Sequence, residues 1–193
     1  ADSLPGHLDA QGLASYFPGT AGSATLTAYL LDLATLAGFN IPEDSRQRML
    51  QGLTAYVEGR IRTQEWSPAD SLLHRRVNAL QALTRQGVQA TRAAAALDID
   101  PLRLPTAALI DWVQITRRLP ALPQRDQKLA NAQQELRNRL SYAGSRLVFT
   151  SEREDYWWWM MLNADANAFR LIEAMLDDPA WQADLPKLMQ GAL

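Results

Sequence analysis

The histidines are the first side chains in this sequence that could do chemistry. His7 and His74 are the only ones, and neither has a second histidine or a cysteine at a spacing that suits a metal ion. A single histidine can still act as a general base. We expect both to be structural or solvent-facing, and the sequence predicts no metal site and no cofactor site.

Acidic residues gather beside two prolines. Asp98 and Asp100 flank Ile99 ahead of Pro101, and the run Asp177-Asp178-Pro179 has the same character. At the rim of a helical toroid, two such acids could serve as the acid and the base or nucleophile of a glycosidase. Aspartate also caps turns and short helices before proline. We expect the capping role at both places.

A third acidic group, Glu152, Glu154 and Asp155, lies between two apolar stretches. It could form a loop that binds a metal ion or a substrate. The regular oxygen spacing and turn glycine of a calcium loop are missing. We expect a solvated hairpin tip.

The aromatic block Trp157, Trp158 and Trp159 is the strongest candidate for a binding role. Exposed tryptophans can stack on sugars or anchor a protein contact. Neighbouring residues of a strand alternate between its two faces, so at least one of the three should be buried. Core packing and contact with a neighbouring domain both stay open.

Composition excludes several classes of function. The 193 residues are 47% hydrophobic and 21% charged, with a formal net charge of −2 and no cysteine. That balance is typical of a globular protein and argues against a nucleic-acid partner, since Arg75-Arg76 and Arg117-Arg118 are too short for a basic stripe. No apolar run reaches the length of a membrane span. No phosphate-binding, dinucleotide-binding, serine-hydrolase or zinc-protease motif occurs.

These side chains must be positioned by helices, because apolar residues recur at steps of three and four along most of the chain. Proline and glycine mark the ends of the runs, as at Gly38, Pro42, Ser67-Pro68, Gly87 and Pro105. A short β-hairpin is expected near 146–160, from Arg146–Thr150 and Tyr156–Met160, which are rich in β-forming residues. The expected helices are about 23–38, 42–61, 67–87, 89–97, 105–119, 126–143, 163–176 and 184–193.

Eight helices with short connections favour an all-α fold of four antiparallel pairs, arranged as a solenoid or an α/α toroid. No repeat recurs at a fixed period. We expect a single all-helical domain over 1–193 with an irregular segment over 1–22. No signal peptide opens the sequence, and its start, Ala1-Asp2-Ser3-Leu4-Pro5, reads as a cut made inside something longer, so we expect the domain to be part of a larger multidomain chain.

Two stretches near the N-terminus carry a resemblance to a known family. The run from Gly22 to Leu31, Gly-Ser-Ala-Thr-Leu-Thr-Ala-Tyr-Leu-Leu, resembles a helix-opening string in the thioester domain of the α2-macroglobulin and complement family. The preceding run Gly12-Leu-Ala-Ser-Tyr-Phe-Pro18 is similar to a stretch in bacterial members. Tyr156–Trp159 and the helix expected from Asn163 to Leu176 also match in position.

The resemblance implies an incomplete α/α toroid and a structural, non-catalytic role within a periplasmic inhibitor. Such a parent is cut by a protease in a bait region, rearranges, and cages the protease. The reactive Cys and Gln of the family's thioester would lie upstream of this sequence. The implied partners are other domains of the parent and, through it, target proteases. Two alternatives remain, a toroidal glycan-degrading enzyme and a helical protein-interaction scaffold.

Overall fold

The computed structural model describes residues 4–63, 72–150 and 166–192. Within them the fold is all-α with one short antiparallel β-hairpin, as expected from the sequence. The chain forms two compact units, Ala1–Asp98 and Ile99–Leu193, which we call unit 1 and unit 2. The expectation of one domain over 1–193 stays a prediction.

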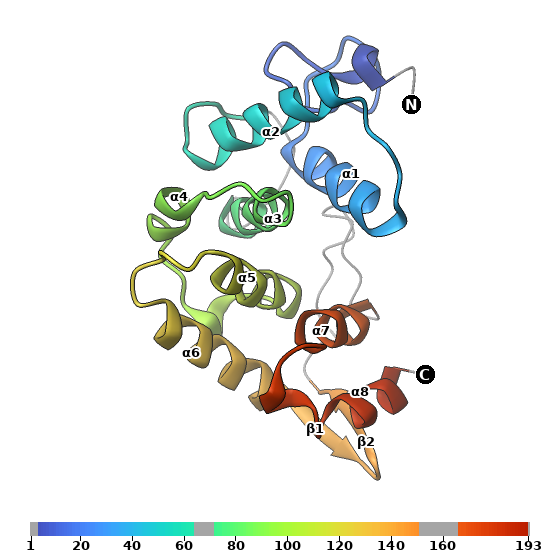
Figure 1. Ribbon diagram of the computed structural model, residues 1–193, viewed down its shortest axis with the longest axis vertical. Coiled ribbons are helices and arrows are strands. Elements are labelled where there is room, and N and C mark those ends of the chain that lie inside the picture. The colour runs from blue at the N-terminus through green and yellow to red at the C-terminus, as the bar shows by residue number, and fades with distance from the viewer. Residues whose placement is uncertain (1–3, 64–71, 151–165, 193) are drawn as a thin grey trace. The chain divides into compact units, whose positions relative to one another are not determined.

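Unit 1 is a group of helices in which the first three contact one another, while the short fourth helix contacts the third (Figure 1). A single 3-10 turn, Leu4–His7, precedes them. The helices are α1 (Ala24–Ala37), α2 (Glu43–Val57), α3 (Leu72–Arg85) and α4 (Thr91–Ala95).

Local signals fix both ends of α1. The Ser23 side chain caps the helix by accepting a hydrogen bond from the Leu26 backbone N–H, and Gly38 ends it in the left-handed conformation that favours glycine. The end at Gly38 confirms the prediction. The expected apolar stripe is not wholly buried, however, because Tyr29 and Leu33 are exposed.

The core of unit 1 lies between the three long helices. Its buried side chains include Leu50, Leu53 and Val57 on α2, and Val77 and Leu80 on α3. Two expected helix bounds were wrong. The second helix ends at Val57 instead of continuing to residue 61, and the alanine-rich helix expected over 89–97 is only one short turn, since helices of that length are marginal without packing.

Unit 2 is built around α5 (Thr106–Arg118), whose interior positions Leu109, Trp112 and Val113 are buried. This helix packs against α6 and α7, and α7 packs against α8 (Figure 1). The other elements are the 3-10 turn Pro101–Arg103, α6 (Arg125–Asn138), β1 (Leu140–Ala143), β2 (Arg146–Phe149), α7 (Asn167–Met175), the 3-10 turn Pro179–Trp181 and α8 (Leu185–Ala192).

The β-hairpin confirms one expected strand and changes its partner. Strand β2 falls inside the expected Arg146–Thr150 stretch, but it pairs with Leu140–Ala143, with Leu140 opposite Phe149. Those partner residues had been expected to finish the helix over 126–143, so that bound was wrong. The turn at Gly144 folds the chain back, and α8 packs on β2. The other expected strand, Tyr156–Met160, lies outside the described residues.

Arg137 and Arg139, at the C-terminal end of α6, both make hydrogen bonds within unit 2. Arg139 donates hydrogen bonds to Glu135, to the Thr106 hydroxyl and to the Pro101 carbonyl oxygen, and so ties α6 to the start of unit 2. A guanidinium offers five donors in a fixed plane, which suits it to joining several acceptors.

Across the described ranges, no helix is both long and apolar enough to cross a membrane.

Candidate functional site

Two of the predicted sites lie outside the described residues. They are the tryptophan block Trp157, Trp158 and Trp159 and the acidic group Glu152, Glu154 and Asp155. The choice between core packing and interdomain contact for the tryptophans therefore stays open.

The two histidines lie on different secondary-structure elements of unit 1. His7 is half-buried at the end of the first 3-10 turn, with Nδ1 3.2 Å from the Ser15 carbonyl oxygen. His74 is half-buried in the first turn of α3. Among the residues with described positions, no three His, Cys, Asp or Glu side chains gather where they could hold a metal ion.

The acidic residues before proline act as caps, which confirms that prediction for Asp100 and Asp178. Each is the N-cap of a 3-10 turn and accepts a hydrogen bond from the backbone N–H two residues ahead, at 3.1 Å and 3.0 Å. Asp178 also accepts hydrogen bonds from Arg117 and, at 2.6 Å, from Gln133. Its carboxylate thus links α5, α6 and the 3-10 turn Pro179–Trp181 within unit 2.

The N-terminal segment, residues 4–22, is held together by the carboxylate of Asp9. One oxygen accepts from the backbone N–H groups of Gln11 and Leu13, and the other accepts from the N–H of Gly22, each at 2.9 Å. Arg48 of α2 donates to the Asp9 carbonyl oxygen at 3.1 Å. One side chain therefore closes the loop on itself and sets its ends beside α1 and α2.

A close backbone contact seats this segment on α2. Gly12 has a φ of +83°, and a Cβ at that position would lie 2.3 Å from the Arg48 carbonyl oxygen. Only glycine meets both conditions without strain. The tight approach explains why Leu13 and Ala14, the next two residues, are buried.

The segment is joined to α1 through a buried threonine. The Thr27 hydroxyl donates to the Ser23 carbonyl oxygen at 2.6 Å and accepts from the Ala14 backbone N–H at 2.8 Å. The Ser23 N–H in turn donates to the Ala14 carbonyl oxygen at 2.8 Å. The two stretches of sequence that carry the family resemblance thus form one hydrogen-bonded structure.

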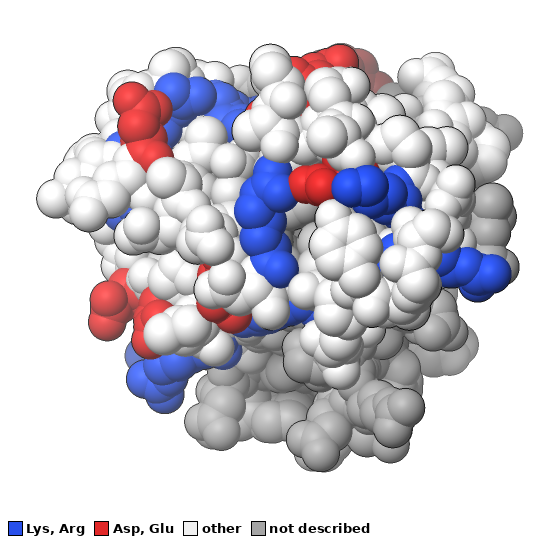
Figure 2. All heavy atoms as spheres, turned by 90° about the horizontal axis from the view of Figure 1, so that it is seen from below, with Lys and Arg blue, Asp and Glu red and all other residues white. Residues whose placement is uncertain are grey.

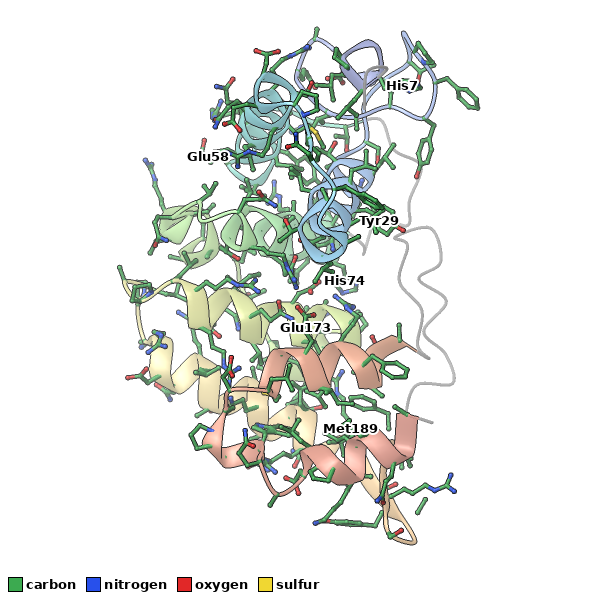
Figure 3. The ribbon with its side chains drawn as sticks, turned by 45° about the vertical axis from the view of Figure 1, so that its right-hand side comes forward. His7, Tyr29, Glu58, His74, Glu173 and Met189 are labelled. Atoms are coloured by element: carbon green, nitrogen blue, oxygen red, sulfur yellow. The ribbon has the colours of Figure 1, made fainter. Side chains whose placement is uncertain are left out.

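An apolar surface lies on α1 and the residues just after it, away from the contact that Thr27 makes with the N-terminal segment. Its members are Tyr29, Leu33, Leu36 and Phe39, all exposed, and we call them the α1 apolar face. Leu36 is 61% and Phe39 65% exposed. Figure 3 places Tyr29 on the side of α1 turned away from α2 and α3. Large exposed apolar groups at helical spacing are uncommon on the surface of a monomer and mark contact surfaces.

A hollow adjoins this face. It has a volume of about 580 Å³ and is lined by Leu30 and Phe39 of the α1 region, by Ile41, and by Leu4 and His7 of the N-terminal segment. The loop after Ser15 adds the exposed aromatic side chains Tyr16 and Phe17. Apolar groups therefore dominate this part of unit 1, which suits packing against another apolar surface better than chemistry.

Unit 2 uses most of its charges internally. Arg170 of α7 donates to Asp111 of α5 at 2.6 Å, and Asp111 is only 1% exposed. Arg137 donates to Asp184 at 2.5 Å and lies 4.0 Å from the ring centre of the buried Trp181. Among the described residues on the face shown in Figure 2, basic and acidic side chains are interspersed.

One exposed ion pair and one exposed hydrogen bond shift pKa values, and neither forms a reactive centre. Hydrogen bonds from Arg46 and then Gln47 lower the pKa of Glu43, and the bond to Glu43 raises the pKa of Arg46. The hydrogen bond between Lys187 and the Tyr142 hydroxyl raises the pKa of Lys187. Each shift favours the charged form that these groups already have at neutral pH.

The chain matches no protein-family model, no curated protein and no solved structure.

Two residues organise the N-terminal segment without having been predicted from the sequence, Asp9 and Thr27. A local signal existed for Asp9, because an aspartate three residues before a glycine is typical of a turn that the side chain closes. No local signal existed for Thr27. Its partner Ala14 is thirteen residues away.

Proposed function

We propose that this protein is a structural, non-catalytic module of a bacterial α2-macroglobulin-like protease inhibitor, packed within the helical toroid of its thioester-type domain. A protease cleaves a bait region elsewhere in the parent chain, and the parent rearranges and cages it. We place the parent in the periplasm. The capture chemistry, including any thioester, lies outside these residues.

The observation that carries this proposal is the interlock between the N-terminal segment and α1. The sequence strings that resemble the family meet through Ala14, Ser23 and Thr27, and the polar atoms described there are engaged in hydrogen bonds to the backbone. Groups used in this way hold an element in place and are not free to act on a substrate. A structural module is therefore the better fit for this part of the chain.

The α1 apolar face supports the same proposal. A module inside a larger helical domain must pack its outer helices against neighbouring helices, and those surfaces are apolar. Leu36 and Phe39 supply such a surface in unit 1. We propose that neighbouring parts of the parent chain bury it.

The same face favours a second candidate, a helical scaffold that binds a separate protein. Exposed apolar patches also mark sites for partners. The two candidates differ in when the face becomes buried. A module buries it when the parent folds, whereas a scaffold buries it only when the partner binds.

A trapping assay on the full-length parent tests the leading proposal. The parent is incubated with an elastase-like protease, and cleavage of a large protein substrate is compared with cleavage of a small chromogenic peptide. Caging predicts that the large substrate is protected while the small peptide is still cleaved, because only the peptide can diffuse into the cage. Equal cleavage of both substrates after the parent has been cut would refute the proposal.

Methylamine separates the two forms of trapping. An adduct detected by mass spectrometry, with one newly freed thiol, would indicate a thioester in the parent and covalent capture. Protection of the large substrate without an adduct would indicate caging alone.

A matched pair of variants separates the module from the scaffold. Leu36→Asp lies in the α1 apolar face, and Leu176→Asp is a control in unit 2 with a similar exposure of 55%. For a module, Leu36→Asp lowers the thermal stability of the full-length parent but leaves that of the 193-residue chain unchanged. If the thermal stability of neither protein changes, the α1 apolar face is not buried in the parent, and the result favours the scaffold.

A further inference from the structure

Unit 1 contains another pocket, which has a basic lining, unlike the α1 apolar face. It lies between the end of α2, the body of α3 and the short helix α4, and has a volume of about 430 Å³. Arg60, Arg76 and Arg92 come to it from these three regions, and Val57 and Leu97 form part of an apolar wall. Glu58, labelled at the end of α2 in Figure 3, is its single acidic lining residue among those described.

The described lining of this pocket carries more positive than negative charge, with Arg60, Arg76 and Arg92 against Glu58. Arg60 is paired with Glu58, with Nε 2.6 Å from the carboxylate oxygen. Arg76 and Arg92 make no hydrogen bond or ion pair with any residue in the described parts of the chain, and the Nε atom of Arg76 is buried. A buried guanidinium nitrogen without an acceptor is costly, since it has lost water and gained nothing in return.

A glycine turn lies beside one of these guanidinium groups. Gly59 follows α2 with a φ of +74°, and a Cβ there would lie 3.6 Å from the Nη2 atom of Arg76. The guanidinium end of Arg76 is therefore next to the turn that also carries Glu58 and Arg60. Arg76 and Arg92 line the same pocket, and its apolar lining comes from Val57, Ala93, Ala96 and Leu97.

We propose that this pocket binds the phosphate or sulfate group of a small organic molecule. Guanidinium groups bind tetrahedral oxyanions with paired, charge-assisted hydrogen bonds, and two of the arginines have those donors to offer. The volume is within the range of small-molecule sites and exceeds what a free oxyanion fills. The apolar wall, with Leu97 in it, takes the organic part of the ligand.

The site is independent of the proposed role in protease trapping. Arg75-Arg76 appears in the sequence as a short basic pair too small for nucleic acid, and Arg92 stands in the alanine-rich stretch. Only the packing of α2, α3 and α4 brings Arg76 and Arg92 to one pocket.

The experiment is an NMR titration of the 193-residue protein, following the arginine Nε–Hε signals at constant ionic strength. The probes are phenyl phosphate, phenyl sulfate, inorganic phosphate and phenol. We expect saturable shifts with both phenyl esters, weaker binding of inorganic phosphate, and none of phenol. The relative affinities of the two esters distinguish a phosphate ligand from a sulfate ligand.

Variants locate the binding. Arg76→Gln and Arg92→Gln should each weaken phenyl phosphate binding by about tenfold or more, the effect of losing a charge-assisted hydrogen bond. Arg62→Gln removes the same charge from an exposed residue outside the lining and should leave the affinity unchanged. Circular dichroism checks that each variant is folded, and Arg92, being exposed, remains testable if Arg76→Gln is not.

Two results would overturn the proposal. One is the absence of saturation with either ester. The other is an equal loss of affinity in Arg62→Gln and in the pocket variants, because that would mean general attraction between charges and no defined site.

Discussion

Replacing Asp9 with alanine should remove the hydrogen bonds that hold the N-terminal segment together and so lower the stability of the protein. The variant removes the acceptor for the N–H groups of Gln11, Leu13 and Gly22. The exposed N–H of Gln11 regains water, so its loss costs little. The residues Leu13 and Gly22 are buried, and leaving each N–H without an acceptor costs about 1–3 kcal/mol.

Together these two losses lower the free energy of unfolding by about 3 kcal/mol. For a chain of this size, that corresponds to a fall in Tm of about 6–12 °C. Asp9→Asn keeps one acceptor oxygen and should show about half the effect. Thermal unfolding followed by circular dichroism measures the total. Amide hydrogen exchange at Leu13 and Gly22 reports whether the loss is local.

The matched control is Asp44→Ala. Asp44 is exposed in the first turn of α2, where a negative charge stabilises the helix by only a few tenths of a kcal/mol. The reasoning is refuted if Asp9→Ala is no less stable than this control. Retained exchange protection at Leu13 and Gly22 in Asp9→Ala would refute it equally.

Three other perturbations test separate parts of the structure. Thr27→Val should destabilise by about 1–3 kcal/mol, because it leaves a buried N–H without an acceptor, and Thr27→Ser should recover most of this in urea unfolding. Gly191→Ala should destabilise unit 2 by about 1–3 kcal/mol, because its Cβ would lie 2.2 Å from the Leu147 carbonyl oxygen. An unperturbed melting curve would contradict that contact. Since Arg46 lowers the pKa of Glu43, this pair stabilises α2 at neutral pH, and the contribution is lost as the pH falls below 4.5. An NMR titration of the Glu43 carboxyl should therefore give a midpoint below 4.5, and Arg46→Gln should raise it.

Part of the candidate site could be predicted from sequence and part could not. Asp100 and Asp178 each accept a hydrogen bond from a backbone N–H only two residues ahead. The local sequence pattern was therefore enough to predict their capping roles. Tyr29 and Leu33 belong to the apolar periodicity of the sequence, but which of the periodic positions are buried depends on where α2 and α3 lie. Tyr29 and Leu33 are exposed for that reason.

By itself, the sequence determined the helical class and many helix ends, including those at Gly38 and Pro105. Helix hydrogen bonds join residues four apart, and caps act within the same few residues, so the information is local. Tertiary structure alone decided that Leu140–Ala143 is a strand, because its partner is β2 and α8 packs on that strand. It also decided the tie between Thr27 and Ala14. Such pairings depend on which distant segments meet, and that is set by the packing of the whole unit and not by any short stretch of residues.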